Sequence, residues 1–157
     1  MRKRYSVWLW IAVVLLLFTG AVHSLSLFMT PAPQNETEKQ LLLLLTTYKQ
    51  DAGAGFHPTL GDLLTALSSC FTFLCLLAGA STAYLLRKKV APDILKGLVL
   101  IQLLVMSACF VVMLIFTFLP PIVLTGLCVL FLAIGLLTIQ SPAQVGAGPD
   151  VPLASQN

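Results

Sequence analysis

Two histidines and two acidic residues stand where helices could bring them to one end of a bundle. His23 lies near the end of the first apolar segment, and His57 directly precedes the second. Imidazole and carboxylate groups together can bind a metal ion or relay a proton. Around them we expect a ligand-binding set of six side chains: His23, Ser26, Glu38, Tyr48, His57 and Asp62.

The spacing of the two histidines does not favour a metal or a haem. They lack the i, i+4 spacing of helical metal ligands. His57 falls in a connector, whereas a two-histidine haem site needs opposed histidines inside a bundle. Each histidine could instead anchor a helix end at the membrane interface. We therefore predict no bound metal and no cofactor.

The cysteines give no catalytic pattern either. Cys70, Cys75, Cys109 and Cys128 all fall within apolar segments, and no C-x-x-C pair occurs. In hydrocarbon a thiol behaves as a small apolar group. This argues against a thiol oxidoreductase, and no catalytic residue is predicted.

The elements that must carry these residues are membrane-spanning helices. Hydrophobic residues make up 58% of the 157-residue chain and charged residues 10%. A helix needs about 20 apolar residues to cross the hydrocarbon core. The sequence predicts an all-α fold, a four-helix transmembrane bundle in one domain (1–140), followed by a disordered cytoplasmic tail (141–157). The predicted spans are about 5–28, 59–86, 92–118 and 121–140.

A short extracytoplasmic helix is expected at 35–50, between the first two spans. Asn35 and Glu38 have the spacing of a capping box, as do Thr59 and Asp62 before the second span. The leucines at 41–45 are too few to span a membrane. They either bury against the end of the bundle or lie in the membrane interface. The glycine-containing connector after this helix is expected to be flexible.

The basic residues predict the orientation. They gather at 2–4, at 87–89 and at Lys96, whereas only Lys39 and Lys49 lie between the first two spans. Because cytoplasmic loops collect lysine and arginine, both termini are expected in the cytoplasm. The basic clusters would attract anionic headgroups, and membrane lipids are the expected partners. Nucleic-acid binding is not expected.

The second span carries a stripe of small residues that we expect to pack against neighbouring helices. Gln102 is expected to hydrogen-bond between helices. No acidic or basic residue lies deep within a span, which disfavours ion-coupled transport. The small-residue stripe consists of Gly61, Thr65, Ser69, Thr72, Cys75, Gly79 and Ala83.

One resemblance adds to this interpretation. The run from His23 to Phe28, the Pro31-x-Pro33 pattern, the acidic and leucine-rich helix and the polar second span resemble an uncharacterised family of small bacterial four-helix membrane proteins. The resemblance implies a four-helix integral membrane fold in the bacterial inner membrane. It brings no activity and no functional residue.

The sequence therefore predicts a small, non-enzymatic integral membrane protein. It would bind a lipid or another apolar ligand, or serve as an accessory subunit beside other membrane proteins. Two alternatives stay open: a membrane enzyme acting on a lipid or quinone through the histidine and acid cluster, and a component of a transporter or channel.

Overall fold

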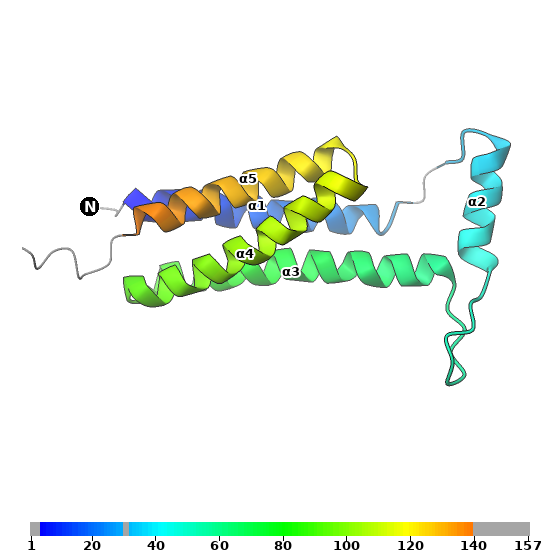
Figure 1. Cartoon of the computed structure of the whole chain (residues 1–157), viewed down its shortest axis with the longest axis horizontal. Helices are drawn as coiled ribbons and strands as arrows, with labels where there is room; N and C mark the ends of the chain where they lie inside the picture. Colours follow the sequence, from blue (N-terminus) through cyan, green and yellow to red (C-terminus); the bar gives the residue numbers. More distant parts are fainter. Residues whose placement is uncertain (1–3, 30–31, 140–157) are drawn as a thin grey trace, which may run out of the picture. The chain divides into compact units, whose positions relative to one another are not determined.

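The described part of the chain folds into five helices, four of which are long and apolar enough to cross a membrane. The computed structural model describes residues 4–29 and 32–139. The predicted all-α fold, the four spans and the short helix between the first two are confirmed, and the protein is a multi-pass membrane protein. The helices are α1 (Arg4–Ser26), α2 (Glu36–Thr47), α3 (Leu60–Lys88), α4 (Pro92–Phe116) and α5 (Leu119–Thr138) (Figure 1).

Prolines and capping side chains determine where the helices begin. Pro92 stands at the start of α4, where its missing N–H and fixed φ are tolerated. α5 begins at Leu119, two residues before the predicted start, so its two prolines fall in the first turn. The predicted tail, 141–157, lies outside the described residues.

The described chain forms two compact units. Among the described residues, the first unit contains the start of α1 as far as Val13 and the segment from Ser81 to Ile139. The second unit is the segment Val14–Ala80, with the rest of α1, all of α2 and most of α3. α1 and α3 therefore contribute to both units.

The first unit is tightly packed at an aromatic pair and at a leucine that contacts a glycine. Trp8 of α1 stacks on Phe131 of α5, with 6.0 Å between ring centroids. The side chain of Leu9, which is fully buried, lies directly against Gly135. Because a membrane supplies no hydrophobic drive for helix association, such close contacts carry much of the packing.

A buried polar cluster joins the end of α3 to α4 in the same unit. The hydroxyl of Thr82 donates a hydrogen bond to Oε1 of Gln102 over 2.8 Å. Nε2 of Gln102 donates in turn to Oγ of Ser81 over 3.1 Å. The predicted interhelical hydrogen bonding of Gln102 is confirmed, and it supplies polar partners where lipid could not.

In the second unit, the later half of α1 runs antiparallel to α3. A Cβ atom at Gly20 would lie 3.3 Å from Cβ of Cys75, and one at Gly79 would lie 2.9 Å from the side chain of Leu17. These contacts leave no room for larger residues, so the two helices approach closely at both glycines.

Candidate functional site

The predicted ligand-binding residues all belong to the second unit. The ring of His23 is half-buried and meets Phe71 edge-on, 5.0 Å between centroids. His57 is exposed in the connector before α3, and Tyr48 is 61% exposed at the end of α2. The side chain of Ser26 lies outside the described part of the chain.

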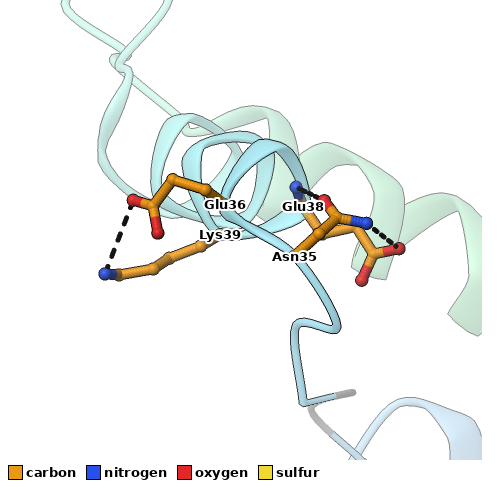
Figure 2. A network of polar contacts seen from close by, with 4 residues as sticks. All are labelled: Asn35, Glu36, Glu38 and Lys39. Carbon is orange, nitrogen blue, oxygen red and sulfur yellow. Dashed lines mark hydrogen bonds and ion pairs between the residues drawn. The ribbon is translucent and has the colours of Figure 1, made fainter.

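Both predicted acids use their carboxylates to begin helices. Glu38 accepts hydrogen bonds from the backbone of Gln34 (2.6 Å) and from Nδ2 of Asn35 (3.2 Å). The side-chain oxygen of Asn35 accepts from the backbone of Glu38 over 2.8 Å, as Figure 2 shows. This reciprocal pair is the predicted capping box at the start of α2.

The second capping box is also confirmed. Asp62 accepts from the backbone N–H and the hydroxyl of Thr59, over 2.9 and 2.7 Å. The hydroxyl of Thr59 accepts from the backbone of Asp62 over 3.1 Å. These bonds orient the carboxylate of Asp62 toward its own helix end.

Within the described residues, no group of three or more histidine, cysteine or acidic side chains could hold a metal ion. The joint ligand-binding role of the six residues stays a prediction.

The burial of the small-residue stripe increases along α3. Gly61, in the first turn of α3, lies against the end of α2, and an added Cβ would be 2.9 Å from the carbonyl oxygen of Leu45. Thr65 is exposed, and the hydroxyl of Ser69 donates to its carbonyl. The members farther along α3 are mostly buried. Thr72, Cys75 and Gly79 are buried in the second unit, and Ala83 is half-buried in the first.

The connector after α2, predicted to be flexible, is closed by hydrogen bonds. Lys49 and Thr59 pair as an isolated antiparallel bridge, and Gln50 donates to the carbonyl of Pro58 over 2.9 Å. Asp51 accepts from the backbone of Gly53, which begins the turn. The signal was present in the sequence, since aspartate two residues before glycine is a common turn-former.

A cavity of about 790 Å³ lies in the first unit, between the start of α1 and the turn that joins α3 to α4. We call it the α3–α4 cavity. Its size falls within the range of small-molecule sites, roughly 300–1,000 Å³. Its lining combines aromatic, aliphatic and basic side chains. The lining residues are Tyr5, Ser6, Trp10, Leu85, Leu86, Arg87, Lys89, Val90, Ala91, Pro92 and Leu95.

The turn that forms one wall of the cavity has an unusual residue at its centre. Lys89 has φ +51°, in the left-handed region, and follows the last residue of α3. Its N–H donates to the carbonyl of Leu86, and the N–H of Val90 donates to that of Leu85. This pair of bonds defines a Schellman motif, in which the left-handed position is usually glycine.

The electrostatics of the cavity favour an anion. Arg87 and Lys89 line it, and none of its lining residues is acidic, although Asp93 follows the lining residue Pro92 in the first turn of α4. α4 begins at the same wall without a side-chain cap, because its N-cap residue is Ala91. The first N–H groups of a helix and its dipole both attract negative charge.

Tyr5 and Trp10 give the same cavity an amphipathic side. Aromatic rings of this kind prefer the headgroup level of a bilayer. The sequence shows the aromatic residues and the basic triplet as separate features on the predicted cytoplasmic side. Their convergence in one cavity was missed, because it depends on how α1 is rotated against the end of α3.

Comparison with known proteins finds no matching family model, no matching curated protein and no matching solved structure.

Proposed function

We propose that this multi-pass membrane protein binds an anionic phospholipid, with the lipid headgroup held in the α3–α4 cavity. The proposal rests on the lining of that cavity, which combines Arg87 and Lys89 with aromatic and aliphatic side chains and contains no acidic residue. A phosphate group would meet the two cations and the uncapped start of α4. The glycerol and upper acyl region would lie along Tyr5 and Trp10, which are half-buried.

The lipid would come from the cytoplasmic leaflet. Arg87 and Lys89 belong to the basic cluster that the distribution of charges assigns to the cytoplasm. Anionic lipids give that leaflet a negative surface potential, which attracts such clusters by about 1 kcal/mol per charge. The resemblance to small bacterial membrane proteins would make this the inner leaflet of a bacterial inner membrane.

Native mass spectrometry of the purified full-length protein tests the proposal. The protein is released from detergent that contains equal amounts of phosphatidylglycerol and phosphatidylcholine. The mass of each complex then identifies which lipid stays bound and how many molecules of it. We expect phosphatidylglycerol to be retained preferentially. Arg87→Gln should lower its affinity about fivefold, the equivalent of ~1 kcal/mol for one charge.

Lys96→Gln is the matched control. Lys96 is exposed and belongs to the same basic region, but it does not line the cavity. Its loss should change phosphatidylglycerol retention much less than the loss of Arg87. Equal retention of the two lipids, or equal effects of the two substitutions, would contradict a headgroup site in the cavity.

A further inference from the structure

We propose that α2 lies flat in the bilayer interface at the side where α3 begins, with one apolar stripe turned into the lipid. The stripe consists of Leu41, Leu44 and Tyr48, and we call it the α2 stripe. Positions i, i+3 and i+7 fall on one face of a helix. This inference goes beyond the proposed function, since the α2 stripe lies in the second unit and shares no residue with the α3–α4 cavity.

The α2 stripe is exposed within the described chain. Leu41, Leu44 and Tyr48 are 55%, 58% and 61% exposed, and α2 has no buried residue. The sequence left two positions for these leucines, against the bundle end or in the interface. For Leu41 and Leu44 this exposure argues against the first position, whereas Leu42 and Leu45 on the neighbouring face are half-buried. Covering a large apolar side chain is worth about 1.5–3 kcal/mol, so the stripe needs a partner.

The side of α2 away from the stripe is mainly polar. Glu36 and Lys39 form an ion pair over 3.6 Å with both side chains largely exposed, as Figure 2 shows. Thr46 lies on this side and satisfies its hydroxyl on the backbone of α2 itself. Leu43 is the apolar exception there. A helix with one apolar stripe and a largely polar opposite side suits the plane of an interface.

Lipid is the occupant that the surroundings of α2 favour. Its last turn touches the start of α3, where Gly61 faces the carbonyl of Leu45. α3 is a membrane span, and its first turns expose Leu63 and Leu64 by 43% and 49%. The α2 stripe therefore lies near the start of a span whose exposed leucines would face lipid.

The direction of α2 agrees with this placement. Within the second unit, α2 runs across the axis of α3 near its first turn (Figure 1). A helix that lies across a spanning helix runs along the membrane plane. Residues 36–47 contain two glutamates and one lysine. Apolar burial, rather than attraction to anionic lipid, must therefore hold the helix in the interface.

Photo-crosslinking in the full chain tests the proposal. Benzoylphenylalanine is introduced at position 41 or at position 39, and native membranes are irradiated before purification and mass spectrometry. The two positions are two residues apart but point to opposite sides of the helix. Both original side chains are exposed, and far-UV circular dichroism checks that each variant is folded.

We expect lipid adducts at position 41 and several times fewer at position 39. The position 41 adduct should persist in vesicles of phosphatidylcholine alone. A cross-link from position 41 to a second copy of the chain would overturn the proposal in favour of a dimer. A cross-link to another protein would make the stripe a subunit contact. Equal lipid adducts at both positions, or none at position 41, would also overturn it.

Discussion

Substituting Lys89 by glycine should move stability and lipid affinity in opposite directions. Lys89 is in the left-handed region at φ +51°, and it lines the α3–α4 cavity. A non-glycine residue pays roughly 1–2 kcal/mol for this conformation. Glycine removes that cost but adds about 0.4–1 kcal/mol of chain entropy to the unfolded state. The net change for Lys89→Gly is a gain of between zero and about 1.6 kcal/mol in stability.

The same substitution removes one cation from the cavity wall. If a phosphate headgroup binds there, affinity for phosphatidylglycerol should fall about fivefold, for ~1 kcal/mol of lost attraction. Thermal unfolding in detergent without added lipid measures the first effect, by far-UV circular dichroism. Native mass spectrometry with phosphatidylglycerol measures the second.

Lys88→Gly is the matched control, because it removes the same charge one residue earlier. Lys88 is the last residue of α3 and lies over the ring of Tyr84 rather than in the cavity lining. Glycine in a helix costs up to about 1 kcal/mol, so this variant should lose stability and keep most of its lipid affinity. If both variants lose stability together, the argument from the backbone of Lys89 is refuted. If both lose lipid affinity equally, the assignment of the headgroup to the cavity is refuted.

Two further pairs of substitutions test the packing of the spans by thermal unfolding in detergent. Gly79→Ala should destabilise the protein, because a Cβ there would lie 2.9 Å from an α1 leucine. Gly97→Ala, with nothing within 4 Å of an added Cβ, should gain up to ~1 kcal/mol from helix propensity. Thr82→Val should cost about 1 kcal/mol, because it removes the donor to Gln102. Thr72→Val should be neutral or stabilising, since in the described chain the buried hydroxyl of Thr72 has no hydrogen-bond partner. Equal effects within either pair would contradict the packing described for these helices.

The spans and the helix starts could be predicted from the sequence because their causes are local. Hydropathy over about 20 residues determines whether a helix can span, whatever its neighbours are. The capping boxes at Asn35 and Thr59 depend on two side chains three residues apart, and both form as expected. Hydrogen bonding by Gln102 between helices was predictable, since an amide side chain within a membrane must find polar partners. Which partners it finds, Thr82 and Ser81, depends on the register of α3 against α4.

The α3–α4 cavity could not be predicted because its causes are not local. Trp10 and Arg87 are far apart in sequence, and only the packing of α1 beside the end of α3 brings both to one wall. The left-handed conformation of Lys89 had no signal either, since glycine is the usual residue at that position. Sequence reasoning instead singled out histidines and acids, whose residue types suggest chemistry wherever they stand.

The contacts of the charged residues explain why the cavity is the stronger candidate site. The carboxylates of Glu38 and Asp62 each accept hydrogen bonds from a helix start. These bonds hold each capping carboxylate at its helix end, and turning it away toward a ligand would give up the cap, at a cost of roughly 0.5–2 kcal/mol. Arg87 and Lys89 line a cavity without an acidic residue, so an arriving phosphate displaces no carboxylate from its wall. A polar residue type is therefore weaker evidence of a binding site where its side chain already serves the local structure.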